Sequence, residues 1–251
     1  MTVTEPWIDR LASDRTLLGR FSTAEWLAEQ IRDEIIEGSL RSEDKLSDKD
    51  ISEKLKMSRN TVREAFRLLS HERLLVHELH RGVFVRRLDA DDVLDLYRVR
   101  RIVESSALHS VEGPASAALA PVHDAVAAGR RAAAERHWRE LGTANMRFHE
   151  ALVALAGSPR LNEIMRRLIA ELRLAFQVMD RPREFHEPYL DGNAEIAALL
   201  EGGDVAGART ALAGYLDRAE RQLVDEMRRK DAAKAAPARR PGAPEAPAGA
   251  G

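Results

Sequence analysis

The chain of 251 residues contains no cysteine, which excludes a disulfide scaffold and a metal site with thiolate ligands. It also lacks a strong charge of either sign, because 39 lysines and arginines are opposed by 41 aspartates and glutamates. A protein that coats nucleic acid through its overall charge would be strongly basic, so any basic patch in this chain must be local. Aromatic residues make up only 5% of the sequence. Alanine, leucine, arginine and glutamate are abundant instead, which favours helices.

Long apolar runs are missing as well. No stretch approaches the roughly 20 apolar residues that a membrane-spanning helix needs. The first 20 residues carry scattered charges instead of the apolar core of a signal peptide. We therefore expect a cytoplasmic protein with no membrane contact. Apolar residues still account for 44% of the chain, which is enough to form a core in one large domain or two small ones.

Three helices are predicted in the first quarter of the chain, and small polar residues mark where they begin. Ser22 is expected to cap the first helix and to form a capping box with Glu25, and Gly38 ends that helix. Ser47 is expected to cap the second helix and Ser58 the third. Apolar residues at helical spacing follow each cap.

The periodicity changes after the third helix. Residues 75–79 and 83–85 are rich in β-branched and apolar residues, and the turn-like segment His80-Arg81-Gly82 separates them. This pattern predicts a small β-hairpin. Three helices followed by a hairpin is the order of elements in a winged helix-turn-helix.

The rest of the chain has only helical patterning from Asp89 to about Arg229, interrupted at positions that contain glycine or proline. These interruptions predict about six or seven helices in an antiparallel bundle. The predicted fold is therefore mainly α: a mobile arm at 1–20, a winged helix-turn-helix at 21–87, an all-helical domain at 88–230, and a tail at 231–251. The composition of the tail cannot support a core, so we expect it to be disordered.

The third helix combines an apolar face with a basic one, and a helix of this kind fits the major groove of DNA with its N-terminal residues at the base edges. Arginine pairs with guanine and asparagine with adenine, whereas hydroxyls and the helix N-terminus suit phosphate oxygens. Lysine and arginine outside this helix are expected to contact the DNA backbone, and a glycine at the hairpin tip allows close approach. The predicted DNA-binding residues are Lys49, Ser58, Arg59, Asn60, Thr61, Arg63, Arg67, Arg81 and Gly82. The alternative is an amphipathic helix whose basic face is merely solvated.

This region resembles the DNA-binding domain of the GntR family of bacterial transcription regulators. The resemblance extends from Ile31 to Val85 and is carried by Ile31-Arg32, Ile35, Gly38, Leu46, Ile51-Ser52-Glu53, the run from Ser58 to Ala65, and Arg81-Gly82-Val83-Phe84-Val85. The sequence departs from the family pattern at three places. Ser42-Glu43 stands where the family usually has Pro-Gly, Thr61 where it usually has proline, and Lys49 where it often has arginine.

The helical second half resembles FCD, the effector-binding domain of the FadR branch of that family. The supporting residues are the run from Asp91 to Arg100, Glu104, the segment Phe148-His149-Glu150-Ala151-Leu152, Gly203-Asp204 and Ala208. Many FCD domains hold a divalent metal with an aspartate and three histidines. The corresponding positions here are Asn145, His149, Asn193 and Tyr215, so one of the four expected ligands is present. Zn²⁺, Ni²⁺ or Mn²⁺ normally requires more imidazole and carboxylate ligands. We therefore predict no tightly bound metal and no cofactor.

A polar cluster inside the bundle remains. The resemblance implies an effector site, and the candidate residues are Arg100, Asn145, His149, Arg173, Asn193 and Tyr215, with Arg100 or Arg173 available to pair with a carboxylate or phosphate. An organic acid or a larger acyl molecule would suit such a site. The alternative is a set of buried polar groups that satisfy one another and have lost any sensing role.

The function expected from these features is that of a homodimeric, sequence-specific DNA-binding regulator. Two winged domains would occupy a palindromic operator, and an effector would shift their relative placement. Repression is favoured over activation because occupancy near a promoter blocks polymerase without further contacts. An enzyme is the main alternative class, but the sequence has no P-loop, G-x-S-x-G, H-E-x-x-H or G-x-G-x-x-G motif. A helical interaction module with an accessory DNA-binding domain is the third possibility.

Overall fold

The computed structural model describes residues 7, 8, 11, 22–111, 116–177, 179 and 182–235. Most of the predicted arm at 1–20 lies outside these residues, but Trp7, Ile8 and Leu11 are described and are buried in the core. Helix α11 continues to Ala235, so the first five residues of the predicted tail are helical. The remaining tail residues lie outside the described part.

The N-terminal domain is the winged helix-turn-helix that the sequence predicts. Its elements are α2 (Thr23–Ile36), β1 (Lys45–Leu46), α3 (Asp48–Leu55), α4 (Arg59–His71), β2 (Leu75–Glu78) and β3 (Gly82–Val85). The hairpin β2–β3 is antiparallel, with Glu78 opposite Gly82. The two-residue strand β1 was not predicted, and it pairs with the free edge of β3, which gives the strand order β1-β3-β2.

The predicted helix caps are present. The Ser22 hydroxyl accepts a hydrogen bond from the backbone N–H of Glu25, while the Glu25 side chain accepts one from the Ser22 N–H, which completes the capping box. Ser47 and Ser58 cap α3 and α4 in the same way, without the reciprocal carboxylate. These side chains satisfy N–H groups that have no partner within the helix, and this explains why the helices begin where they do.

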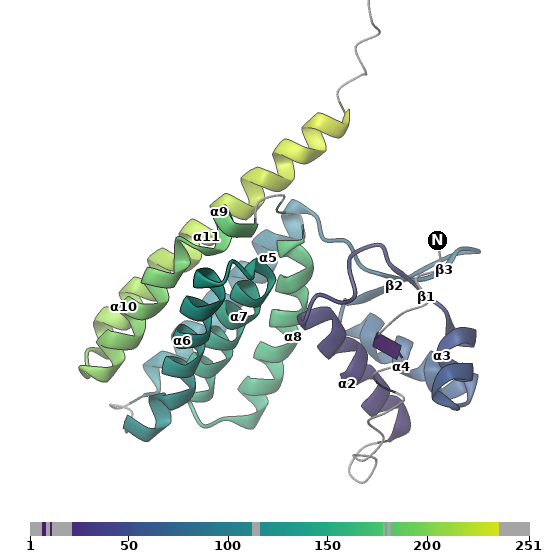
Figure 1. The fold of residues 1–251 in the computed structure, drawn as a ribbon, viewed down its shortest axis with the longest axis horizontal. Coiled ribbons are helices and arrows are strands. Elements are labelled where there is room, and N and C mark those ends of the chain that lie inside the picture. The colour runs from purple at the N-terminus through teal and green to yellow at the C-terminus, as the bar shows by residue number, and fades with distance from the viewer. Residues whose placement is uncertain are drawn as a thin grey trace, which may run out of the picture.

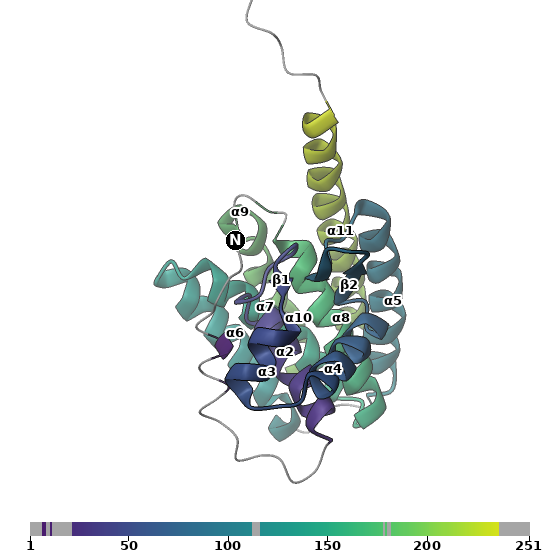
Figure 2. The same cartoon turned by 90° about the vertical axis from the view of Figure 1, so that its right-hand side faces the viewer.

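The second domain is a helical bundle, and its described part contains seven α-helices and a short 3₁₀ helix (Figure 1). They are α5 (Ala90–His109), η2 (Ser116–Leu119), α6 (Ala120–Ala134), α7 (Trp138–Ala154), α8 (Pro159–Phe176), α9 (Pro182–His186), α10 (Tyr189–Glu201) and α11 (Val205–Ala235). The break between α6 and α7 was not predicted, because it contains neither glycine nor proline. Arg136 adopts a positive φ of 60° there. Figures 1 and 2 both show the end of α11 extending beyond the bundle.

Helix α8 connects the two domains, because it packs against α5 and α7 on one side and against α2 on the other (Figures 1 and 2). Arg166 of α8 donates to Asp33 of α2 at 2.6 Å. Near the end of α8, the Nη2 of Arg173 donates to the backbone carbonyl of Glu37 at 3.2 Å. We call this contact region the domain junction.

The turn that follows α2 belongs to the same junction and contains the departure from the Pro-Gly pattern. The backbone N–H of Ser42 donates to Oε1 of Gln177 at 2.6 Å, and Nε2 of Gln177 donates to the carbonyl of Leu40 at 3.2 Å. Proline has no N–H, so Ser42 makes the first of these bonds possible. Glu43, where the family has glycine, adopts a φ of 72°, a conformation that is strained for a residue with a side chain.

This strain yields a prediction about stability. Glu43→Gly should raise the free energy of unfolding by up to about 1 kcal/mol, because relief of the left-handed conformation outweighs the extra freedom of glycine in the unfolded chain. Glu53→Gly, a matched change on exposed helix α3, should lower it by about 1 kcal/mol. Urea denaturation measures both, and two losses of equal size would contradict the assignment of strain to Glu43.

Candidate nucleic-acid interface and buried polar cluster

Helix α4 has the two faces that its sequence predicts. Val62 and Phe66 are buried at 0% and 4% exposure and hold the helix against the domain core. The side chains of Arg59, Asn60, Arg63 and Arg67 are exposed on the other face. At the N-terminus the Ser58 hydroxyl caps the helix by accepting from the Thr61 N–H at 3.0 Å, and it lies 2.8 Å from the Thr61 hydroxyl.

Two of the exposed arginines converge on Asp48, which the sequence did not single out. Nη2 of Arg59 lies 2.9 Å from Oδ1 of Asp48, and Nε of Arg63 lies 2.7 Å from its Oδ2. Partial burial acts to raise the pKa of Asp48, but the hydrogen bonds from the two guanidinium groups prevail and lower it. The carboxylate therefore stays ionised and keeps the two guanidinium groups close together.

The wing contributes further positive charge. Lys45 and Arg81 both lie over the ring of Phe84, at 5.8 and 5.3 Å from its centre. Gly82 has a φ of 116°, and a Cβ there would lie 3.2 Å from Cε of Lys45, so glycine allows this close approach. Lys45 was not predicted, because only the pairing of β1 with β3 places it in the wing.

A groove of about 720 Å³ separates the wing from α4, and Lys45, Arg63, Arg67, Arg81 and Gly82 contribute to its lining. Of the predicted DNA-binding residues, four therefore line this groove, and Ser58, Arg59, Asn60 and Thr61 lie at the N-terminal end of α4. Lys49 is exposed on the first turn of α3, 4.0 Å from Glu53. The groove and the start of α4 together form a basic, solvent-accessible surface of the kind that contacts DNA.

In the helical domain, five of the six predicted effector residues lie in one buried network. Oδ1 of Asn145 accepts from Nδ2 of Asn193 at 2.8 Å and from the hydroxyl of Tyr215 at 2.7 Å. The Tyr215 ring packs edge-on against His149, with 5.1 Å between ring centres. We call Arg100, Glu104, Asn145, His149, Asn193 and Tyr215 the buried polar cluster.

The charged part of this cluster is a chain of three side chains centred on Glu104, which is fully buried. Nε of Arg100 donates to Oε1 of Glu104 at 2.8 Å, and Nδ1 of His149 lies 2.7 Å from Oε2. Burial acts to raise the pKa of Glu104, but Arg100 and His149 outweigh it and lower the pKa. Burial lowers the pKa of His149, so its imidazole is neutral at pH 7. Its Nδ1–H therefore donates to Glu104, and Nε2 is left as an acceptor.

Four buried polar atoms in and beside the cluster have no hydrogen-bond partner among the described residues. They are Nε2 of His149, Oδ1 of Asn193, Nη2 of Arg100 and the hydroxyl of Tyr97, whose ring lies under the Arg100 guanidinium at 4.8 Å. Buried polar atoms are seldom left unpaired, because each costs about 1–3 kcal/mol. A polar ligand or a water molecule bound among them would supply the missing hydrogen bonds.

The residues present do not fit the metal site of FCD domains. The amide oxygen of Asn145, at the carboxylate position, already accepts two hydrogen bonds. Burial raises the pKa of Tyr215 well above its ordinary value, so its phenol stays protonated at a histidine position. Among the residues that the structure describes, no group of three histidines, aspartates or glutamates is placed to hold a metal ion. Of the four described residues at these ligand positions, His149 is the one with a ring nitrogen that has no hydrogen-bond partner.

The sixth predicted residue, Arg173, lies outside the cluster. Its guanidinium group sits between Gly38 and Gly142, where an added Cβ would come within 2.5 and 3.0 Å of its nitrogens. Among the described residues, its hydrogen-bond partner is the Glu37 carbonyl. Burial, followed by the charge of Arg139, lowers the pKa of Arg173 to about 10. Arg173 therefore belongs to the domain junction and lies apart from the other five candidate effector residues.

Comparisons with known proteins agree with both domains. Residues 23–85 match the model of the bacterial regulatory proteins of the gntR family, and residues 95–218 match the model of the FCD domain. The chain is similar to a structure titled as a GntR transcriptional regulator from Rhodococcus sp. RHA1. The two are 40% identical with a TM-score of 0.75, and the match covers 82% of this chain and 99% of that one.

More distant relatives extend the same picture. The chain is 28% identical over 176 residues to the uncharacterized HTH-type transcriptional regulator BphR of Paraburkholderia xenovorans, a match that covers 64% of this chain and 71% of that protein. It is 26% identical over 152 residues to the Nta operon transcriptional regulator of Aminobacter aminovorans, a match that covers 60% of this chain and 72% of that protein. The fold is also that of E. coli McbR/YncC, with a TM-score of 0.71 at 20% identity over 82% of this chain and 99% of that one.

His186, whose ring lies beside Arg173 and Gly142, yields a prediction about pH. Burial and then Arg173 lower its pKa from the ordinary 6.5 to about 3, so the unfolded chain takes up a proton first as the pH falls. The free energy of unfolding therefore falls as the pH drops below 6.5. Between pH 7 and pH 5, His186 alone should lower it by about 2 kcal/mol. In His186→Gln this part of the loss should vanish, as measured by urea denaturation at both pH values. The exposed-histidine variant His80→Gln should keep the full loss, and an unchanged loss in His186→Gln would refute the assignment.

Proposed function

The chain belongs to the GntR family of bacterial transcription regulators, and we propose that it acts as a homodimer that represses transcription from a palindromic operator. It is a transcription regulator with an FCD-type second domain, not an enzyme. The observation that carries the proposal is the basic surface formed by the start of α4 and the groove beside the wing, with Arg59 and Arg63 exposed and held together by Asp48.

The roles of individual residues follow from their positions on this surface. Arg59, Asn60 and Arg63 lie in the first turns of α4 and would face base edges in the major groove. Ser58 and Thr61, at the helix N-terminus, suit phosphate oxygens. Lys49, Arg67 and Arg81 would contact the DNA backbone, and Lys45 joins them. Two copies related by a twofold axis would present two such surfaces to two half-sites.

An effector is proposed to bind at the buried polar cluster. The unpartnered atoms are a donor on Arg100, acceptors on His149 and Asn193, and the Tyr97 hydroxyl. A small organic acid that also carries a hydroxyl or amino group would satisfy both kinds of atom, with its carboxylate at Arg100 and its hydrogen-bond donor at His149 or Asn193. Effector binding would not require a metal ion, because Arg100 supplies a positive charge inside the cluster.

We further propose that the protein works in the cytoplasm, where its DNA target lies. None of the helices in the described part of the chain has both the length and the apolar character that crossing a bilayer requires. Effector binding would alter DNA binding by changing the relative placement of the two winged domains of the dimer. This change would be a shift between two populated arrangements.

The DNA-binding proposal predicts opposite effects for two variants. Arg63→Ala should weaken binding to duplex DNA from the protein's own upstream region by about tenfold or more, since a bidentate base contact contributes about 1–3 kcal/mol. Asp48→Asn should strengthen binding to a random duplex, because it removes a negative charge from the surface and leaves both arginines. It should also lower the preference for the operator, because the arginines lose their fixed orientation.

Mobility-shift titrations at several salt concentrations measure both effects. Arg98→Ala, an exposed arginine on α5 in the other domain, is the matched control and should bind like the unaltered protein. Failure of the unaltered protein to bind any duplex at low salt would overturn the proposal, because phosphate contacts alone should give measurable affinity there.

The effector proposal predicts that Tyr97→Phe separates ligand binding from folding. The Tyr97 hydroxyl is buried without a partner, so its removal should leave the melting temperature unchanged or raise it. The thermal shift caused by an effector, identified from a panel of hydroxy and amino acids, should become smaller. Tyr189→Phe, which removes a hydroxyl bonded to Gln222 at 2.8 Å, is the control that should keep the shift. A large shift with Zn²⁺ or Ni²⁺ that depends on His149 would contradict the metal-free site.

A further inference from the structure

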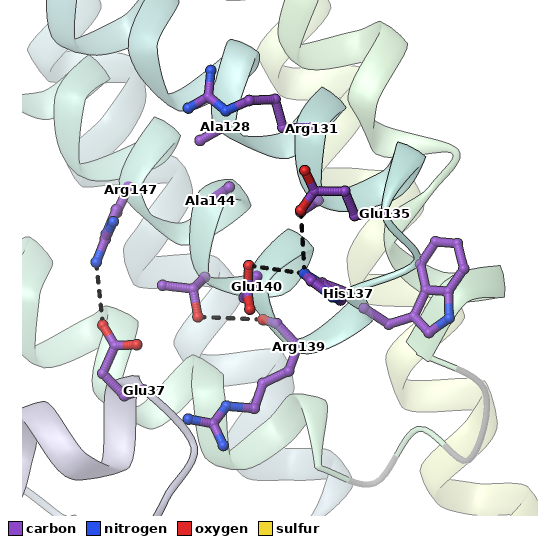
Figure 3. Close-up of a pocket in the computed structure, with 12 residues that line it drawn as sticks. Glu37, Ala128, Arg131, Glu135, His137, Arg139, Glu140, Ala144 and Arg147 are labelled. Atoms are coloured by element: carbon purple, nitrogen blue, oxygen red, sulfur yellow. Dashed lines mark hydrogen bonds and ion pairs between the residues drawn. The ribbon is translucent and has the colours of Figure 1, made fainter.

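The hollow at the domain junction and the groove beside the wing differ in the groups that line them. The hollow has a volume of about 770 Å³ and is lined by three arginines and three glutamates. Figure 3 shows Arg147 paired with Glu37, at 3.2 Å. Glu135 and Glu140 both lie 3.4 Å from Nδ1 of His137 (Figure 3). Positive and negative groups are equal in number, so the charges of this hollow do not favour a charged ligand.

The groove beside the wing contains two histidines that the sequence did not single out. His77 of β2 and His80 at the hairpin tip are exposed, and both contribute to the lining of the groove. His77 lies opposite Val83 of β3, which also lines the groove. Neither imidazole has a hydrogen bond or an ion pair with another described residue. Both are therefore available to a molecule that enters the groove.

The two histidines differ in how far the fold accounts for them. His80 adopts a φ of 61°, a conformation that histidine tolerates better than most residues do, so the hairpin turn accounts for its presence. His77 stands inside a strand, where β-branched and aromatic residues are the usual choice. Because no backbone requirement favours histidine at position 77, His77 is the stronger candidate for a role in binding.

Helix α4 forms the opposite wall of the groove. Arg63, Arg67 and Ser70 line it and are spaced by four and three residues, so they share one face of the helix. Lys45 of β1 and Arg81 of the wing complete the positive groups of the lining. A row of phosphates in the groove would therefore meet hydrogen-bond donors of α4 on one side and the two histidines on the other.

The fixed charges of the groove nearly cancel. Four cations line it, but Asp48 lines it too and lies 2.7 Å from Nε of Arg63. Glu64 and Glu78, which do not belong to the lining, pair with the other two arginines. Four positive groups are thus opposed by three carboxylates, which leaves one net positive charge. Protonation of both histidines would triple this net charge, so their protonation state has a large effect on how the groove attracts a polyanion.

Histidine is the side chain whose ordinary titration falls between pH 5 and pH 8. A phosphate near an imidazole favours the protonated form, because the opposite charges stabilise each other. We propose that His77 and His80 contact phosphates of duplex DNA as imidazolium groups, so that DNA binding takes up protons. This inference rests on the proposed function, because it requires DNA in the groove. The affinity for DNA should then fall as the pH rises, since fewer protons are available for uptake.

Fluorescence-anisotropy titrations of the full chain test the inference, with a labelled duplex from the protein's own upstream region at pH 6, pH 7 and pH 8 and constant ionic strength. Each histidine should contribute up to about tenfold to the loss of affinity between pH 6 and pH 8, the effect of one hydrogen bond to a charged group. The plot of log affinity against log salt concentration should be steeper at pH 6 by up to about one for each histidine, because each phosphate contact releases a counterion. A purely structural role would leave this slope unchanged.

Three single variants separate the contribution of His77 from that of other groups. His77→Gln should lower the affinity at pH 6 and change it little at pH 8, where histidine is ordinarily neutral. His77→Lys should bind tightly at both pH values, because lysine keeps its charge throughout this range. His109→Gln, which alters an exposed histidine on α5 in the other domain, is the matched control and should keep the full pH dependence.

Three results would overturn the inference and leave the repressor proposal standing. The first is DNA binding with the same affinity and salt dependence at pH 6 and pH 8. The second is a pH dependence that persists when His77→Gln and His80→Gln are combined. The third is loss of the pH dependence in His71→Gln, because His71 lies 3.4 Å from Arg67 at the end of α4 and does not line the groove.

A fourth result would reach further. If the unaltered protein binds no duplex at any of these pH values in low salt, the proposed DNA-binding function fails, and the inference fails with it.

Discussion

The placement of the winged domain on the helical domain depends on how one guanidinium group is accommodated. Arg173 reaches from α8 to the end of α2 through a space that exists because positions 38 and 142 are glycines, where an added Cβ would come within 2.5 and 3.0 Å of the arginine nitrogens. Its target, the Glu37 carbonyl, lies at the negative end of the α2 dipole, which stabilises a cation there. One turn further along, at the C-terminal end of α8, the Gln177 side chain accepts a hydrogen bond from the Ser42 N–H and donates one to the Leu40 carbonyl. Backbone contacts of this kind fix the path of the chain independently of side-chain rotamers.

The buried polar cluster balances its charge with its own residues. Arg100 neutralises Glu104 at 2.8 Å, and both residues belong to the stretch that resembles FCD domains. Asn145 and Tyr215, which are uncharged, stand at two of the positions where those domains have metal ligands, and the Tyr215 hydroxyl donates to Asn145 at 2.7 Å. The side chains of the cluster are therefore held to one another by their own hydrogen bonds and by one buried ion pair.

The sequence predicted the elements whose boundaries are encoded locally. Caps at Ser22, Ser47 and Ser58, the hairpin around Gly82 and the bundle were all correct, because each depends on residues close together in the chain. It missed β1, the role of Asp48 and the position of Arg173. These depend on pairings between distant segments, such as Lys45 with Phe84, and no local pattern signals them. The candidate polar residues of the cluster were found through a family resemblance. Glu104 also belongs to that resemblance, but it was not recognised as the charged centre of the cluster.

Helix α7 brings these features together. Gly142, Asn145 and His149 are spaced by three and four residues and therefore share one face of the helix. Gly142 borders Arg173, while Asn145 and His149 belong to the cluster, so a ligand that shifts α7 at the cluster also moves the wall against which Arg173 rests. Since α8 contacts α7 and α2, a displacement of α7 by a fraction of an ångström alters a tight contact with the winged domain. Packed contacts of this kind do not deform smoothly and exchange between discrete arrangements instead, which is the physical requirement for a ligand to control the placement of a winged domain.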